Sequence, residues 1–313
     1  MNINQRKVGV ILSYITLGLN ALIGMIYVPL MIKYLGQQEY GLYQLMGSLI
    51  SYFAIMDFGL SSTVVRFYSK YDAEKDKKGK ENVLGIARRI YYVITIIMLF
   101  LGMIFSIKLD VLFGSSLSIH ELQEAKKIFI MLLVNIAITL LSNIYTSIIT
   151  ANENFIFLKL LSIFQITIQP AAIIAVLLFT PRAFLIVVVQ TLFNLLAALI
   201  KYFYCRFGID DKIKYHYYDK NLIKGMLSFS MSIFIVSIVD QVFWKSNQII
   251  LGITAGTAIV AVYSIAAQIY MNYMPLSTVI QSVFLPSITR IAAQKGNDRI
   301  LSPELFIGFQ KTP

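Results

Sequence analysis

Long apolar segments dominate this sequence and constrain its fold more than any other feature. A helix of about 20 residues crosses a hydrocarbon core of roughly 30 Å, whereas transmembrane β-strands are runs of about ten residues with alternating hydropathy. The apolar segments here are continuous and of the helical length. The expected spans are residues 8–32, 41–65, 85–107, 127–150, 156–179, 183–204, 226–251 and 257–285. The sequence therefore predicts an all-α polytopic membrane protein with about eight transmembrane helices.

The composition excludes several other classes of protein. Hydrophobic residues make up 58% of the chain, charged residues only 14%, and the mean hydropathy is +0.72. A soluble domain has about a quarter charged residues. The net charge of +11 does not indicate nucleic-acid binding, because the basic residues lie in the loops between apolar segments. The single cysteine, Cys205, excludes an internal disulfide and a cysteine-based metal cage.

The distribution of lysine and arginine predicts the topology. If the N-terminus is cytoplasmic, the inner loops contain most of the 27 basic residues, including the run from Arg66 to Arg89. The outer loops contain only Lys33, Lys108, Lys126, Lys127 and Arg182. By the positive-inside rule, both termini are cytoplasmic. The first apolar segment is too long for a signal-peptide core and has no Ala-x-Ala cleavage site, so it is expected to be a retained helix.

A weak internal repeat organises the chain. Tyr40–Tyr43 is echoed by Val260–Tyr263, and Thr63–Arg66 is echoed by Ser287–Arg290, about 220 positions later. Repeated helix bundles are typical of secondary transporters. We therefore predict a six-helix bundle over residues 1–205, a cytoplasmic linker over 206–225, the first two helices of a second bundle over 226–290, and a polar tail over 291–313.

Polar residues form stripes on several of these spans, and two interpretations stay open. They can form hydrogen bonds between packed membrane helices, or they can line a shared hydrated cavity. Stripes on five spans favour the cavity. The residues predicted to line it are Asn20, Asn143, Asn194, Asp240, Lys245, Gln268 and Asn272.

Three ionisable residues, Asp57, Asp240 and Lys245, fall inside predicted spans. A charge at the bilayer centre costs roughly 2.5–3.5 kcal/mol even on the lenient insertion scale, so none of the three is expected to face lipid. Lys245 is the cation available inside a span for an anionic substrate. Asp57 lies off the polar face of its helix and is expected either to lock onto a neighbouring helix or to take part in ion coupling.

No catalytic or metal-binding pattern is found in the sequence. The histidines are His120 and His216, and there is no phosphate-binding Walker loop, His-Glu-x-x-His motif or cysteine pair. The expectation is a protein that is not an enzyme and that uses no metal or cofactor.

Several motifs carry a resemblance to a known family. Leu35–Tyr43 (LGQQEYGLY), Asp57–Leu60 (DFGL), Val65–Tyr68 (VRFY) and Asn247–Gly252 (NQIILG) resemble the polysaccharide flippases of the multidrug/oligosaccharidyl-lipid/polysaccharide exporter superfamily. Family members often have Asp where this chain has Asn247. The resemblance implies two six-helix bundles around a central cavity. It also implies movement of an undecaprenyl-pyrophosphate-linked oligosaccharide across a bacterial plasma membrane, with H⁺ or Na⁺ as a possible coupling ion.

The polar motif residues Glu39, Arg66 and Arg290, together with Asp57, are expected to have structural or ion-coupling roles.

Two full bundles need well over 400 residues at the repeat spacing given above, so the chain is expected to be a C-terminally truncated product that does not flip substrate alone. Two alternatives are a cation-coupled drug antiporter of the same superfamily, with Asp57 or Asp240 as the ion site, and a membrane polysaccharide polymerase or acyltransferase. The absence of an intramembrane histidine disfavours the last.

Overall fold

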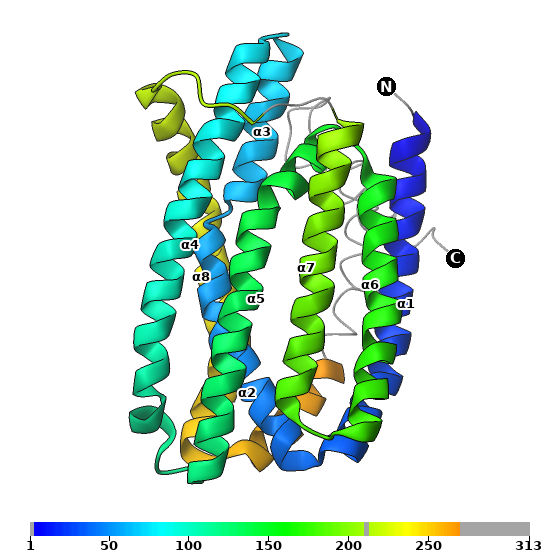
Figure 1. Cartoon of the computed structure of the whole chain (residues 1–313), viewed down its shortest axis with the longest axis vertical. Helices are drawn as coiled ribbons and strands as arrows, with labels where there is room; N and C mark the ends of the chain where they lie inside the picture. The colour runs from blue at the N-terminus through cyan, green and yellow to red at the C-terminus, as the bar shows by residue number, and fades with distance from the viewer. Residues whose placement is uncertain (1–2, 210–212, 270–313) are drawn as a thin grey trace, which may run out of the picture. The chain divides into compact units, whose positions relative to one another are not determined.

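The computed structural model describes residues 3–209 and 213–269, and in them the chain is almost entirely helical (Figure 1). The elements are α1 (Ile3–Leu35), α2 (Gln37–Ala54), the 3-10 turn η1 (Ile55–Asp57), α3 (Leu60–Ala73), α4 (Lys77–Phe113), α5 (Ile119–Ala151), α6 (Phe155–Phe179), α7 (Ala183–Gly208) and α8 (Lys220–Ala255). A shorter apolar helix, Thr257–Ile269, follows. The chain divides into residues 1–264, described below, and residues 265–313.

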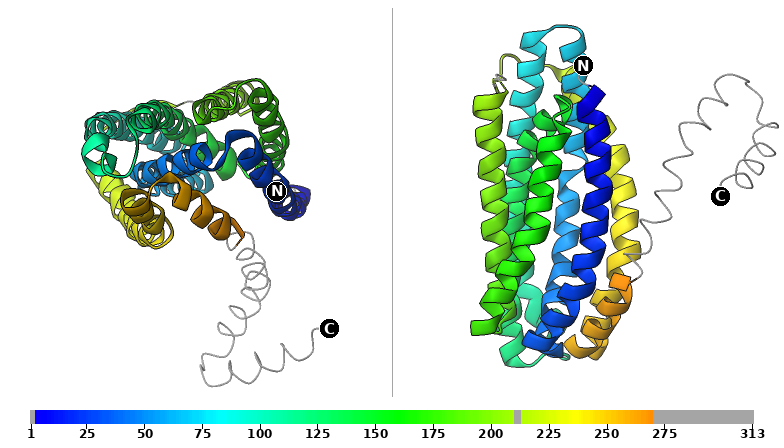
Figure 2. Two further views of the ribbon diagram at one scale, coloured as in Figure 1. Left: turned by 90° about the horizontal axis from the view of Figure 1, so that it is seen from below. Right: turned by 90° about the vertical axis from the view of Figure 1, so that its right-hand side faces the viewer.

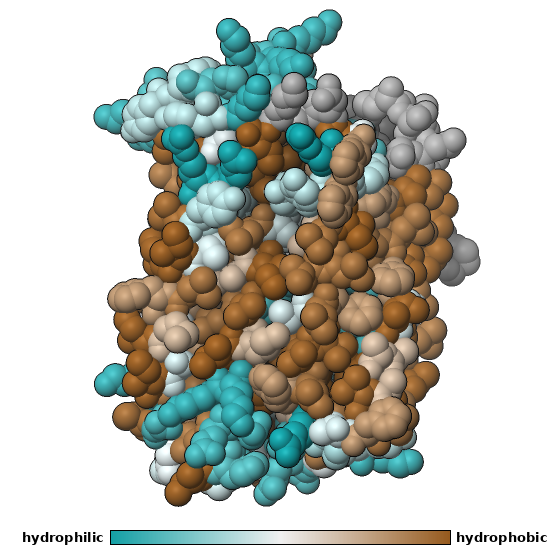
Figure 3. Space-filling model, in the orientation of Figure 1, coloured by the Kyte–Doolittle hydropathy of each residue, from teal (hydrophilic) through white to brown (hydrophobic). Residues whose placement is uncertain are grey.

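The prediction of a polytopic α-helical membrane protein is confirmed. Within the described residues, seven helical segments are long and apolar enough to cross a membrane, with α2, η1 and α3 together forming one of them. Figure 3 shows a hydrophobic belt around the middle of the visible face and hydrophilic residues at both ends. The eighth predicted span, 257–285, begins as a helix at Thr257, and its part beyond Ile269 lies outside the described residues.

Several helices begin earlier than the apolar segments predicted, because polar capping residues start them. The Asp76 carboxylate accepts a hydrogen bond from the Gly79 amide at 2.9 Å, so α4 begins eight residues before the predicted span. Ser118 and Glu121 form a capping box at the start of α5. Asp219 accepts from the Leu222 amide at the start of α8. Hydropathy marks where a helix enters the membrane, and the caps mark where it begins.

Helix α5 lies at the centre of the bundle and packs against α2, α3, α4, α6 and α7. Helix α1 lies along α6, and α8 lies along α2 and α3. In the left view of Figure 2, α1 and α8 lie on different sides of the α2–α3 segment. We call the end where α4 starts, α7 ends and α8 starts the basic end of the bundle; it is at the top of Figure 1.

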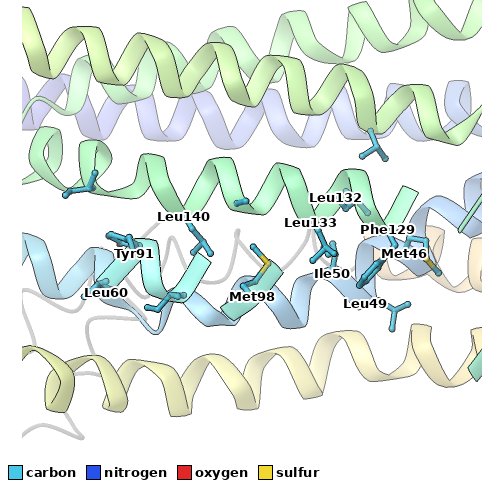
Figure 4. Close-up of a cluster of buried hydrophobic side chains, with 14 of the residues drawn as sticks. Met46, Leu49, Ile50, Leu60, Tyr91, Met98, Phe129, Leu132, Leu133 and Leu140 are labelled. Atoms are coloured by element: carbon cyan, nitrogen blue, oxygen red, sulfur yellow. The ribbon is translucent and has the colours of Figure 1, made fainter. Parts of the chain in front are cut away.

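A cluster of buried apolar side chains joins α2, α3, α4 and α5 (Figure 4). Met46 and Ile50 of α2 lie beside Leu133 and Phe129 of α5, and Met98 of α4 lies nearby. Lipid tails are as apolar as these side chains, so close packing, rather than exclusion of water, holds such helices together. This packing sets the relative positions of the polar residues described next.

The division of the chain into a six-helix bundle, a linker and a partial second bundle stays a prediction. Helix α7 ends at Gly208, α8 begins at Lys220, and the described residues just before α8, Ile213–Asp219, are not helical.

Candidate functional site

The predicted second span is not one continuous helix, and this corrects the expectation for residues 41–65. Helix α2 ends in the 3-10 turn Ile55–Asp57, after which Phe58 and Gly59 have left-handed backbone angles, with φ of 52° and 66°. Glycine adopts such angles without steric cost, so the Phe58-Gly59 pair is the point where the helix axis breaks. The break leaves Asp57 at the junction of two helices rather than on the side of one.

The carboxylate of Asp57 lies between two donors from other helices. Its Oδ1 atom accepts a hydrogen bond from Asn143 Nδ2 of α5 at 2.8 Å and another from the Tyr91 hydroxyl of α4 at 3.2 Å. One turn further along, the hydroxyls of Ser61 and Ser147 are 2.9 Å apart. The break in the second span is therefore tied to α4 and α5 by two side-chain hydrogen bonds.

Asn194 belongs to a different polar cluster, at the interface of α5 and α7. Its Nδ2 atom lies within hydrogen-bonding distance of the Asn135 carbonyl (3.0 Å), Asn135 Oδ1 (2.9 Å) and Thr139 Oγ1 (2.7 Å). Asn135 in turn donates to Thr191 Oγ1 at 3.2 Å. The structure thus brings Asn143 together with Asp57 and places Asn194 in an interhelical hydrogen-bond network of its own.

Helix α8 is fitted closely to the broken span. The hydroxyls of Thr63 and Ser230 are 2.7 Å apart, and those of Tyr52 and Ser246 are 2.8 Å apart. A Cβ atom at Gly59 would clash with the Ile233 side chain. Helix α8 therefore rests directly on the junction that contains Asp57.

Three predicted cavity residues lie at the surface of the described bundle or close to it. Asn20 of α1 and Asp240 of α8 are exposed, and Lys245 of α8 is half-buried. Asp240 lies well inside the membrane-length helix Lys220–Ala255. Gln268 is half-buried in residues 265–269, which belong to the other unit, and Asn272 lies outside the described residues. A single cavity shared by all these residues stays a prediction.

The four residues assigned structural or ion-coupling roles lie apart from one another. Glu39 Oε2 accepts a hydrogen bond from the Ala183 amide at 2.9 Å and so caps the start of α7. Arg66 is exposed and lies over the Phe229 ring at 4.4 Å. Asp57 is at the break described above, and Arg290 lies outside the described residues.

Sequence reasoning missed the partners of these groups. Tyr91, which binds Asp57, reads in the sequence as one of many aromatic residues in an apolar span. The hydrogen bond of 2.6 Å from Gln190 Nε2 to the Tyr43 hydroxyl likewise joins α7 to α2 across a large sequence separation. The Asp57-Phe58-Gly59 order was the one local signal of a break, because a glycine in the left-handed conformation commonly follows the last turn of a helix.

Comparison with known proteins identifies the family. The model of the family described as polysaccharide biosynthesis protein matches residues 7–292, so the chain belongs to this family. This confirms the resemblance found in the motifs. No curated protein matches the sequence.

The fold is shared with transporters of the MOP superfamily. One similar structure is an inward-facing multidrug resistance transporter of the MATE family, with a TM-score of 0.64 and 15% identity over 80% of this chain and 58% of that one. Another is the MATE multidrug transporter DinF-BH in complex with R6G, with a TM-score of 0.62 and 14% identity over 86% and 61%. A third is a MOP superfamily transporter from Pyrococcus furiosus, with a TM-score of 0.59 and 16% identity over 84% and 60%. The chain thus spans about six tenths of the length of these proteins.

Proposed function

We propose that this protein takes part in moving a lipid-linked oligosaccharide, carried on undecaprenyl pyrophosphate, across the bacterial plasma membrane. The observation that carries the proposal is the family match over residues 7–292, since members of this family are described as polysaccharide biosynthesis proteins. The fold supports a transporter, because the similar structures are carriers of the MOP superfamily.

The polar groups at membrane depth support a cavity for a hydrophilic head group. A charged side chain at the bilayer centre costs roughly 2.5–3.5 kcal/mol or more if it faces lipid, yet Asp240 is exposed within α8. We expect further helices to cover this surface in the working carrier and to enclose Asn20, Asp240 and Lys245 in a hydrated space. Side-chain amides donate and accept hydrogen bonds to sugar hydroxyls, and the Lys245 ammonium would neutralise part of a pyrophosphate.

Movement of one bundle against the other would open this space to each side in turn, as in other secondary transporters. In this proposal, the residues described here provide one bundle and the first helix of the other. The exposed charge of Asp240 then predicts that the 313-residue chain does not flip substrate without the helices that cover it.

A complementation experiment tests the proposal. The chain alone, and an extended version that completes the second bundle, are expressed in a strain lacking its own flippase, and surface polysaccharide is measured. We expect polysaccharide only with the extended version, and a loss of at least tenfold when that version carries Lys245→Gln. Lys224→Gln, which removes an exposed charge near the start of α8, is the matched control. Restoration by the chain alone would contradict the need for further helices, and an extended version that restores nothing would contradict the flippase proposal.

A cysteine-labelling experiment tests the cavity directly. Single cysteines replacing Asn143 and Asp240, in a Cys205→Ser background, are treated with a small aqueous thiol reagent. We expect both to react. Unreactive cysteines in folded protein would show that these positions are not in contact with water.

A cation-coupled drug antiporter is the second candidate, and the geometry of Asp57 is the observation that favours it. A half-buried carboxylate held by two neutral donors at a helix break can exchange one donor for a proton or a sodium ion. Drug-resistance assays separate the two candidates. Resistance that is conferred by the extended version and lost in Asp57→Asn, without any effect on polysaccharide, would favour the antiporter.

A further inference from the structure

Two adjoining cavities open between α4, α5 and α7, toward the basic end of the bundle. One has a volume of about 280 Å³ and the other of about 400 Å³, and Arg88, Tyr145 and Tyr202 line both. These three helices form the face seen in Figures 1 and 3, where the hydrophobic belt meets the hydrophilic upper end. A molecule that fills both cavities would therefore lie across the boundary between the membrane interior and the aqueous phase.

The cavity nearer the middle of the membrane is apolar and laterally open. Leu141, Leu195 and Leu199 contribute to its lining, and their side chains are exposed on the surface of the bundle. Tyr92 of α4 is also exposed and lines the same cavity. An exposed apolar groove along membrane-spanning helices suits a hydrocarbon chain, because a flexible chain fills such a groove without leaving polar groups unpaired.

The second cavity is basic. Arg88 of α4, Arg206 of α7 and Lys214 of the segment before α8 line it, and all three are exposed. Its other lining residues within the described part of the chain, Tyr145, Ile148, Tyr202, Cys205 and Ile213, carry no acidic group. Among the described residues, no carboxylate forms a salt bridge with any of the three cations. Three converging positive charges on this side of the groove favour an anion.

One wall of the basic cavity is held in place by specific hydrogen bonds. We call residues Ile213–Tyr217 the strap. Asn82 Oδ1 accepts hydrogen bonds from the backbone amides of His216 (3.0 Å) and Tyr217 (3.2 Å). His216 Nε2 lies 2.7 Å from Glu81 Oε2, and the Arg89 guanidinium stacks on the Tyr215 ring at 3.5 Å. These contacts fix the backbone of Lys214 beside α4, so the cavity is not formed by a loose loop.

The geometry points to a binding site for an anionic phospholipid, whose phosphodiester lies among Arg88, Arg206 and Lys214 and whose acyl chain lies in the apolar cavity. Basic pockets between membrane helices recognise anionic lipid head groups in this way. An anion with a long hydrocarbon tail matches both halves of the site, whereas a soluble phosphate would use only one.

The site adjoins the Asp57 junction. Tyr91 lines the apolar cavity and also donates a hydrogen bond to Asp57, whereas Asp57 and Asn143 themselves are not among the described residues that line either cavity. The network around Asn194 joins α5 and α7 beside the groove. A polyprenyl pyrophosphate has similar chemistry to an anionic phospholipid, so the experiment has to distinguish the two.

Lipid retention by the purified full chain tests this inference, which does not depend on transport activity. Native mass spectrometry compares phosphatidylglycerol with phosphatidylcholine at equal concentrations. Each basic residue near an anionic lipid contributes a factor of about five in affinity, so Arg88→Gln, Arg206→Gln and Lys214→Gln together should weaken phosphatidylglycerol binding on the order of 100-fold. The matched control is Lys77→Gln, Lys220→Gln and Lys224→Gln, which removes three exposed charges at the same end and should leave binding unchanged.

Further variants and competitors localise the lipid. Leu195→Asn with Leu199→Asn should weaken binding of a long-chain phosphatidylglycerol at least fivefold and leave a short-chain analogue unaffected. If the triple variant does not fold, Lys214→Gln alone should still give a loss of about fivefold. Equal binding by the triple variant and its control would overturn the inference, and so would equal retention of phosphatidylcholine. Competition by inorganic phosphate would instead assign the cavity to a free anion, and stronger binding of undecaprenyl pyrophosphate would assign it to the transport substrate; both results would also overturn it.

Discussion

Asn143 of α5 donates a hydrogen bond to the Asp57 carboxylate over 2.8 Å, and thereby fastens the break in the second span to the central helix of the bundle. The two residues are far apart in the sequence, and each is a polar group at membrane depth that the other satisfies.

Asn143→Leu should destabilise the bundle, because it leaves the Asp57 carboxylate with Tyr91 as its one described donor. Interhelical hydrogen bonds in membranes contribute about 0.6–2 kcal/mol, so the apparent melting temperature of the purified protein should fall by several degrees. Asn20→Leu, at an exposed position of α1, is the control and should change little. Equal losses in both variants would show that the bond to Asp57 contributes no measurable stability.

Gly59→Ala should be destabilising for two reasons. The φ angle of 66° costs a non-glycine residue about 1–2 kcal/mol, and the added methyl group would clash with Ile233 of α8. Adding Ile233→Ala should recover only the part due to the clash. Gly18→Ala and Gly47→Ala are the controls, because a Cβ atom at either position meets nothing within 4 Å. Thermal unfolding of the four proteins measures the difference, and a fully stable Gly59→Ala protein would contradict the left-handed break.

Glu39→Ala should weaken the start of α7, because the carboxylate is the acceptor for the Ala183 amide. Loss of a helix cap costs about 0.5–2 kcal/mol, and Glu39→Gln, which keeps an oxygen acceptor, should lose less. Hydrogen exchange of the first turn of α7 is the sensitive measurement. Gln38→Ala, a neighbouring exposed position, should leave this exchange unchanged.

Asn82→Leu should release the strap from α4. The two backbone amides that bind Asn82 Oδ1 would lose their acceptor, and trypsin should then cut after Lys214 at least several times faster than in the unchanged protein. Asn82→Asp keeps the acceptor oxygen and should protect the strap. Identical cleavage rates for the two variants would show that these hydrogen bonds do not hold the segment.

The predicted topology can be tested at Lys78 in a Cys205→Ser background. A cysteine replacing Lys78 should stay unlabelled by an impermeant thiol reagent in intact cells and should react after permeabilisation. A cysteine replacing Ser115, in the exposed loop before α5, should be labelled from outside. Labelling of the Lys78 position from outside would reverse the orientation of every span.

The seven membrane-length helical segments of the described residues, and their order, could be predicted from hydropathy alone, because long apolar segments have few alternatives to spanning a bilayer. The break at Phe58-Gly59 could not, because apolar residues continue through it and hydropathy does not record backbone handedness. The pairings of Asn194 with Asn135 and of Gln190 with Tyr43 were equally hidden. A polar stripe shows that a partner is needed, and only the packing of whole helices decides which partner it meets.

The contact between the strap and α4 could not be predicted from the sequence either. Asn82 lies near the start of α4, and its sequence neighbours suggest only a helix end beside a basic loop. Asn82 holds the strap, which lies more than a hundred residues later in the sequence and packs back against α4.

The strap also has a mechanical consequence. The strap ends at Tyr217, which is hydrogen-bonded to Asn82 of α4, and α8 begins after its capping residue Asp219. Tyr218 is therefore the one residue between the strap and the cap of α8. A connection of one residue allows little independent movement of α8. If α8 rotates as part of a second bundle, the backbone has to rotate at Tyr218. A larger rotation would break the hydrogen bonds between the strap and Asn82 and so alter the start of α4.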